Sequence, residues 1–334
     1  MTMTSVGDLA RGLVLRTRSS EIRSDIDRLS QELSSGRVGD PSARLGGDYA
    51  HVTDIERGIA RLDSFGVAGT EARLFADAMQ TGLDRVAQGA SALSATLMQA
   101  ESAGMAGSHG IIANEARGAL EGMISALNAR VGGRSVFAGV STDRTPLPSA
   151  DDVLGSLREI LAGSGSAAAA QQAAKAWFQD PTGFGPLYRG SDTPIAPMQV
   201  SEREQVTLDL TAADTTLKEG IMAAALAALA DDPGLGLSVE QRDRLARDLG
   251  ASLANTNDRI IGLQAKVGAA QERIDQASAR NAAARSGLEI ARNELIGADP
   301  YETATRLQAA QSQLDALYSV TVRNARLSLV NYLK

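Results

Sequence analysis

Residues 260–295 read IIGLQAKVGAAQERIDQASARNAAARSGLEIARNEL. Apolar or small residues recur here three and four positions apart, which is the heptad spacing of a coiled-coil helix. Such a helix has one apolar stripe that partner helices must cover. The stretch therefore predicts a long helix packed along other helices. Its seam consists of Ile260, Leu263, Val267, Ala270, Ile274, Ala277, Asn281, Ala284, Leu288, Ala291 and Leu295.

Both ends of the chain repeat this spacing. Gly297 ends the long helix, and Asp299 is expected to cap a last helix that has Pro300 at its first position and Glu302 completing the capping box. The first helix is expected to stop at Gly36. Two apolar seams at opposite ends predict helices that pair with each other and with neighbouring subunits. The expected seam residues are Ile22, Ile26, Leu29 and Leu33 at the front, and Leu307, Leu314, Tyr318, Val322, Leu329 and Leu333 at the back.

The middle of the chain has a different pattern. Prolines and fading periodicity from Arg134 to about Asp209 indicate an inserted module with short helices near residues 152–161 and 167–178, where changes in residues 164–170 are expected to be mild. Val206, Leu208 and Leu210 alternate as a strand would. Thr211 with Asp214, and Ser238 with Gln241, are expected to cap the two helices that follow.

The predicted fold is therefore mainly α. We expect an elongated antiparallel coiled-coil rod built from N- and C-terminal helices, with a small inserted mixed α/β module. Aromatic residues make up only 3% of the chain, which favours thin, closely packed helices over a broad globular core. The expected parts are terminal polymerisation helices over residues 1–45 and 297–334, a rod over 46–140 and 211–296, and an outer module over 141–210.

Charge and composition exclude several classes of protein. The net charge is -7, and residues 1–60 and 251–334 are each nearly neutral, so the acidity lies in the middle and no basic patch points to nucleic acid. The absence of cysteine excludes disulfides and thiolate metal sites. We expect no membrane insertion and, because the apolar run from Leu9 to Leu15 is short and broken by Arg11, export without a cleaved signal peptide.

No catalytic or metal-binding constellation is apparent, so we expect no enzyme, no cofactor and no metal. His51 and His109, the only histidines, are interpreted as solvated surface residues. The pairs at Asp151 and Asp231 are interpreted as helix caps, Gly132-Gly133 as a turn, and Trp177 with Phe178 as the core of the insert. Asn281 has two open readings: it fixes the register of the seam, or it is exposed by a local drift of the helix.

Three stretches resemble the flagellin superfamily. They are Leu29 to Arg37 followed by Asp40-Pro41-Ser42, Gly133-Arg134-Ser135-Val136-Phe137-Ala138-Gly139 with Thr142 and Pro146, and Asp299-Pro300 through Leu327 to Leu333. The central stretch is similar to a "GR-x-x-FAG-x-x-T" segment of the branch that joins the flagellar hook to the filament. The resemblance covers residues 15–145 and 250–334.

This resemblance implies a structural subunit at the hook–filament junction, exported by the flagellar type III apparatus and located outside the cell. It implies a ring-like self-assembly, contact with a neighbouring hook-associated protein and with flagellin, support of flagellin polymerisation in motility, and an export chaperone. Two alternatives remain: flagellin itself, and a coiled-coil tether or adaptor with no flagellar role.

Overall fold

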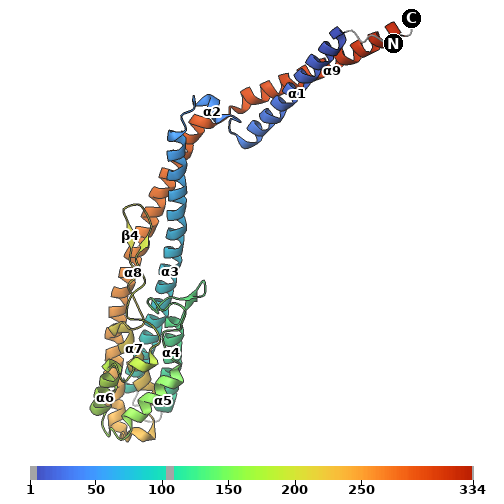
Figure 1. The fold of residues 1–334 in the computed structure, drawn as a ribbon. Coiled ribbons are helices and arrows are strands. Elements are labelled where there is room, and N and C mark those ends of the chain that lie inside the picture. Colours follow the sequence, from blue (N-terminus) through green and yellow to red (C-terminus); the bar gives the residue numbers. More distant parts are fainter. Residues whose placement is uncertain (1–5, 103–108, 333–334) are drawn as a thin grey trace. The chain divides into compact units, whose positions relative to one another are not determined.

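The computed structural model describes residues 6–102 and 109–332, and the chain is mainly helical, as the sequence predicts (Figure 1). Strands are confined to two small hairpins. The elements of the described chain are α1 (Val6–Ser35), α2 (Pro41–Arg44), α3 (Ala50–Ser102), α4 (His109–Leu127), β1 (Arg130–Val131), β2 (Arg134–Ser135), α5 (Ala150–Leu161), α6 (Ala167–Gln179), η1 (Gly185–Leu187), β3 (Met198–Gln199), β4 (Gln205–Val206), α7 (Thr215–Leu229), η2 (Pro233–Leu235), α8 (Val239–Ile296) and α9 (Pro300–Tyr332).

The chain divides into two compact units. Unit 1 contains Met1–Asp63 and Ala282–Lys334, and unit 2 contains Ser64–Asn281. The three-part division expected from the sequence stays a prediction. Unit 1 combines the two ends of the chain, which explains why both ends carry apolar seams.

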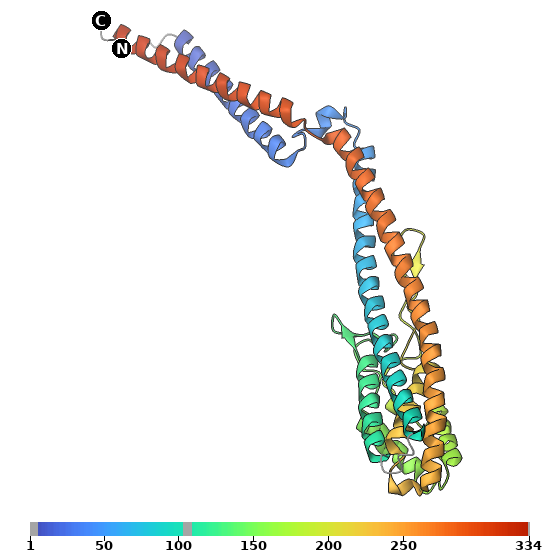
Figure 2. The same cartoon turned by 180° about the vertical axis from the view of Figure 1, so that it is seen from behind.

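Within unit 2, α3 and α8 run antiparallel, and the two long helices lie side by side in Figure 2. Their heptad positions are almost fully buried, including Met79, Leu83 and Ile260. As the residue numbers rise along α3, the residue numbers of the contacting positions on α8 fall, which shows that the two helices are antiparallel. The hydrogen-bonded pairs are Ser94 with Gly250, Asp84 with Gln264, Asp77 with Gln271 and Arg73 with Asp275.

Helices α4 and α7 complete this bundle. They pack on each other, and small residues let them approach the long pair closely. A Cβ on Gly89 of α3 would lie 3.3 Å from the terminal carbon of Met123 on α4, and one on Gly220 of α7 would lie 3.3 Å from Thr256 on α8. Glycine therefore permits close approach of the helices at these two crossings.

The aromatic residues of the insert pack together within the hydrophobic core that the insert shares with the bundle. Three rings contact one another edge-on or stacked, with centroids 4.8 to 5.6 Å apart: Trp177, Phe178 and Phe184. The interpretation of Trp177 and Phe178 as core residues is therefore confirmed. The expectation of mild changes at residues 164–170 is wrong in part. Ala167 and Ala170 are fully buried, because the alanine-rich face of α6 is the face that packs inward.

Two local expectations in the insert also differ from the structure. Only Gln205–Val206 pairs as a strand, with Met198–Gln199, while Leu208 packs into the core without a strand partner. The cap of α7 is Asp214, whose carboxylate accepts from the amide of Thr216 at 2.8 Å, and Thr211 lies upstream. The caps expected at Ser238 and Asp299 do form. At α5 the cap is Ser149, and Asp152 of the expected acidic pair completes its capping box.

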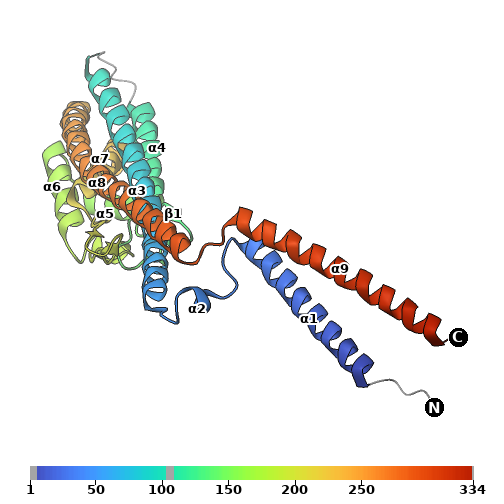
Figure 3. The ribbon, with the colours of Figure 1, turned by 90° about the horizontal axis from the view of Figure 1, so that it is seen from above.

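Unit 1 contains two antiparallel helix pairs. Helices α1 and α9 pack along each other (Figure 3), and the start of α3 packs against the end of α8. In the second pair, a Cβ on Gly58 would lie 2.8 Å from a methyl group of Leu288, so the two backbones approach closely there. As predicted, α1 ends before Gly36, which has a φ of 67°.

Candidate functional site: an assembly surface on the terminal helices

The predicted seam of the terminal helices is only partly buried within unit 1. Ile22 and Leu29 are buried at 4% exposure each, so they form the contact between α1 and α9. Ile26, Leu288, Leu295, Leu307 and Leu314 are half-buried, while Leu33, Tyr318 and Val322 are 41%, 40% and 52% exposed. The side chains of Leu329 and Leu333 lie outside the described residues.

The other predicted seam residues lie in the core of unit 2. Ile260, Leu263, Val267 and Ile274 are all buried against α3 and the segment before α7. Their burial within one subunit assigns them to the helix seam of the chain itself. An assembly surface must therefore come from residues that this packing leaves exposed.

Exposed large apolar side chains are concentrated in unit 1. Among the residues whose side chains are described, unit 1 holds nine and unit 2 holds eight, although unit 1 has about half as many residues. Exposed apolar side chains that gather in one part of a protein are candidates for an interaction site, and those of unit 1 are spread over α1, the loop before α3, α8 and α9. The nine are Leu13, Val14, Leu33, Tyr49, Ile290, Tyr301, Tyr318, Val320 and Val322; we call them the apolar face of unit 1.

Sequence reasoning missed several members of this face. Tyr301 is 85% exposed and Ile290 is 58% exposed, and neither occupies a heptad position. Ile290 lies between the seam residues Leu288 and Ala291, so a seam drawn at fixed spacing passes over it. The signal that could have found it is a large isoleucine on a side of the helix that otherwise carries small and polar residues such as Ser286 and Asn293.

A polar contact joins the two terminal helices. Arg23 on α1 donates to the phenolic oxygen of Tyr318 on α9, with an Nε to oxygen distance of 3.1 Å. The hydrogen bond and charge of the guanidinium lower the pKa of the Tyr318 phenol, and the phenol in turn raises the pKa of Arg23. The contact links positions 295 residues apart and favours one alignment of α1 on α9.

The central motif builds the junction between the bundle and the insert. Phe137 is fully buried, and a Cβ on Gly82 of α3 would lie 2.7 Å from its ring. Gly139 has a φ of 60°, and its Cα faces the backbone carbonyls of Ser191 and Thr193, so only glycine fits there. Arg134 covers the ring of Phe75 at 4.9 Å. The motif residues thus have a structural role within unit 2.

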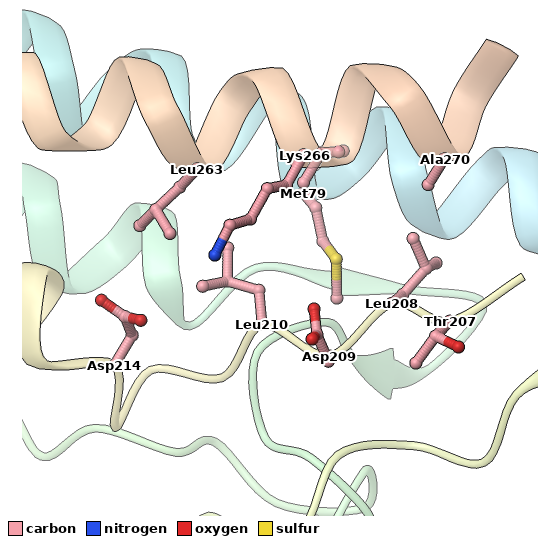
Figure 4. Close-up of a pocket in the computed structure, with 10 residues that line it drawn as sticks. Met79, Thr207, Leu208, Asp209, Leu210, Asp214, Leu263, Lys266 and Ala270 are labelled. Atoms are coloured by element: carbon pink, nitrogen blue, oxygen red, sulfur yellow. The ribbon is translucent and has the colours of Figure 1, made fainter.

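A small cavity in unit 2 opens between α8 and residues 207–214 (Figure 4). Its volume is about 100 Å³, whereas pockets for organic ligands usually span roughly 300 to 1,000 Å³. The close-up shows the Lys266 amino group with the Asp209 and Asp214 carboxylates around an apolar floor. A cavity of this size has room for a few waters at about 30 Å³ each.

The histidines differ from each other. His51 lies exposed at the start of α3, but only 13% of the His109 side chain is exposed, and its Nε2 lies 3.5 Å from Asp243, so the expectation of a solvated His109 is wrong. The helix seam brings α8 close to the start of α4, which spacing within either segment does not reveal. Within residues 6–102 and 109–332, no group of three or more His, Asp or Glu residues is placed to hold a metal ion.

The structure decides between the two readings of Asn281, because the side chain has a polar partner. Its side-chain amide donates to the backbone carbonyl of Val200 at 2.8 Å, while the neighbouring Arg280 forms an ion pair with Glu204. The polar interruption of the seam therefore binds the β3–β4 hairpin to α8.

None of the helices in the described part of the chain is long and apolar enough to cross a membrane.

Comparison with known proteins supports the resemblance seen in the sequence. Residues 253–333 match the family model of the bacterial flagellin C-terminal helical region, which covers most of α8 and α9. A search of curated proteins gave no significant match. The chain is also similar to a solved structure provisionally described as a flagellar hook-associated protein from Vibrio parahaemolyticus, at 11% identity and a TM-score of 0.49, over 73% of this chain and 95% of that one.

The resemblance to the flagellin superfamily is thus confirmed, on the C-terminal region. This region includes the α9 half of the terminal pair and five members of the apolar face, namely Ile290 on α8 and Tyr301, Tyr318, Val320 and Val322 on α9. The match supports a structural role in the bacterial flagellum and self-assembly with other flagellar proteins.

Proposed function

We propose that this chain is a structural subunit at the hook–filament junction of the bacterial flagellum, of the type called flagellar hook-associated protein 3. In this account it assembles into a ring through its terminal helices, connects the hook to the filament, and supports flagellin polymerisation. Its neighbours are a second hook-associated protein on the hook side and flagellin on the filament side.

The observation that carries the proposal is the apolar face of unit 1. Side chains such as Ile290 and Tyr301 lie exposed on helices that belong to, or border, the flagellin-type C-terminal region. Burying apolar area is favourable by about 25 cal/mol per Å². Burial of this face, repeated around a ring of subunits, would drive assembly. Contacts between subunits therefore best explain why the face is exposed in the single chain.

The central motif favours a junction protein over flagellin. The segment from Gly133 to Gly139 resembles the branch that joins hook to filament, and in this chain it determines how the insert is attached to α3 and to residues 191–193. Flagellin remains the second candidate, because the matched family model describes the C-terminal helices of flagellin itself.

Location and export follow from this role. A subunit at the junction lies outside the cell, on the flagellum, and reaches it through the flagellar type III apparatus without a cleaved signal peptide. An export chaperone that covers the apolar face of unit 1 before assembly would keep the free subunit soluble. These points are proposals that depend on the junction role.

Deleting the gene tests the role. The expected phenotype is hooks without filaments, with flagellin released into the medium as monomer, because flagellin is made and exported but has nowhere to polymerise. Loss of flagellin from both cells and medium would identify the chain as flagellin. Motile cells with normal filaments would contradict any flagellar role, and a plasmid copy of the gene serves as the control.

A further inference from the structure

Two crossovers in unit 1 are tied together by backbone hydrogen bonds. The first crossover, residues 36–39, follows α1, and the second, residues 296–298, precedes α9. Arg37 and Gly297 form an antiparallel bridge, with the amide of Val38 bonded to the carbonyl of Ile296 at 3.0 Å and the amide of Ala298 to the carbonyl of Gly36 at 2.9 Å. The two connections are therefore one paired structure.

A buried carboxylate joins this pair to α1. Glu32 is 7% exposed, and its Oε1 accepts from the amide of Gly39 at 2.9 Å and from the guanidinium of Arg28 at 2.9 Å. A buried charge is costly unless its hydrogen bonds are made. Arg28 lies on α1 itself, so folding of the first crossover against the last turn of α1 supplies the second of these two contacts, the amide of Gly39.

A second side chain closes the pair from the other side. Arg44 on α2 donates to the carbonyl of Gly297 at 3.0 Å. Glycine is required at two points: Gly36 has a φ of 67°, and a Cβ on Gly39 would lie 2.8 Å from Arg28 and 3.0 Å from Glu32. Contacts with Glu32 and with Arg44 thus hold opposite strands of the same bridge.

We propose that residues 36–39 and 296–298, with Glu32 and Arg44, form a crossover latch that opens as one cooperative element. The bonds of the latch share atoms or adjoining peptide groups, so breaking one leaves others without support. Opening the latch exposes the Glu32 carboxylate on α1, so the latch couples the folding of both crossovers to the end of α1. This inference holds whether or not the chain is flagellar.

Residue-resolved amide exchange of the full chain by NMR tests the latch with two variants. Arg44→Ala removes a contact to Gly297 only, and Glu32→Gln removes the charge that faces Gly39. A cooperative latch predicts that each variant speeds exchange at Val38, Gly39 and Ala298 together, by on the order of tenfold or more, as loss of a hydrogen bond to a charged group implies. Arg18→Ala, which breaks an exposed ion pair with Glu21 on α1, is the matched control and should leave all three amides unchanged.

The decisive readout is the distant one. Arg44→Ala must speed exchange at Gly39, which Arg44 does not contact by any hydrogen bond described above. If Arg44→Ala changes no amide of the first crossover, or if Glu32→Gln affects Gly39 alone, the crossovers open independently and the latch is refuted.

Discussion

The guanidinium of Arg23 on α1 hydrogen-bonds the phenol of Tyr318 on α9 and lies 5.8 Å from the centre of its ring. This is a polar contact between two helices that also bury Ile22 and Leu29 of α1. Apolar contacts tolerate sliding along a helix, whereas a hydrogen bond at one position does not. The contact between Arg23 and Tyr318 therefore favours one alignment of α1 on α9.

The five tyrosines should not ionise at one pH. The guanidinium of Arg23 lowers the pKa of Tyr318, and burial raises the pKa of Tyr188. An ultraviolet absorption titration should therefore lose its earliest phase in Tyr318→Phe and its latest phase in Tyr188→Phe. Loss of the earliest phase in Tyr188→Phe instead would contradict the contact.

The lowered pKa of Tyr318 also fixes the sign of a stability effect. Because the folded state favours the phenolate, this contribution is complete above the unfolded pKa of about 10 and is lost as pH falls through the folded pKa. The difference in unfolding midpoint between the wild type and Tyr318→Phe should therefore grow as pH rises towards 10. A difference that shrinks over this range would mean that the phenolate is not stabilised by Arg23.

Adding one methyl group to α3 should have opposite effects at two positions. Gly82→Ala places a Cβ 2.7 Å from the buried ring of Phe137 and should destabilise the protein by about 1–3 kcal/mol through overpacking. Gly66→Ala on the same helix meets nothing within 4 Å and should stabilise it by roughly 0.5–1 kcal/mol, because alanine favours the helix. Urea unfolding of both variants measures the two changes. Equal midpoints would show that Phe137 is not packed against Gly82.

The contact between Asn281 and the β3–β4 hairpin can be tested by a single-atom change. Asn281→Asp replaces the donor to the Val200 carbonyl with an acceptor, which should destabilise unit 2 by about 1–3 kcal/mol at neutral pH. Asn255→Asp, at an exposed position of the same helix, is the matched control and should change stability little. Equal unfolding midpoints for the two variants would mean that Asn281 makes no stabilising contact and is exposed instead.

The sequence predicts the helices well and the tertiary contacts poorly. Heptad spacing in residues 260–295 and the caps at Ser238 and Asp299 depend on local chemistry, and the structure confirms these elements. The strand expected at Val206 to Leu210 is shorter, because burial of Leu208 against the bundle satisfies the same alternation as a strand would. Alternation reports which side chains are buried, and a strand is one of several ways to bury them.

The same limit applies to the candidate surface. Seam spacing identifies residues that need a partner, but it does not say whether the partner is in the same chain. Val267 and Ile274 are buried by the chain's own helices, whereas Val322, at an equivalent heptad position, is exposed. Only the three-dimensional arrangement separates these cases, and it also adds Ile290 and Tyr301, which no periodic pattern marks.

Charge at a buried seam position should disturb both the terminal helix pair and assembly. Leu29→Asp places a carboxylate in the buried contact of α1 with α9 and should abolish assembly while loosening the terminal pair itself. Leu314→Asp should act in the same direction but less strongly, because Leu314 is half-buried. Circular dichroism with limited proteolysis reports the loosening, and filament formation in cells reports assembly. Normal filaments with Leu29→Asp would contradict the role of this seam.

The central claim is that the apolar face of unit 1 binds neighbouring subunits. The most direct test is to complement the deletion strain with a double variant that carries Ile290→Asp and Tyr301→Asp. Both side chains are exposed, so the variant should fold and be exported, yet cells should have hooks without filaments and release flagellin into the medium. The matched control, Ile111→Asp on the exposed side of α4 in unit 2, should restore filaments. Normal filaments with the unit 1 variant would contradict the account.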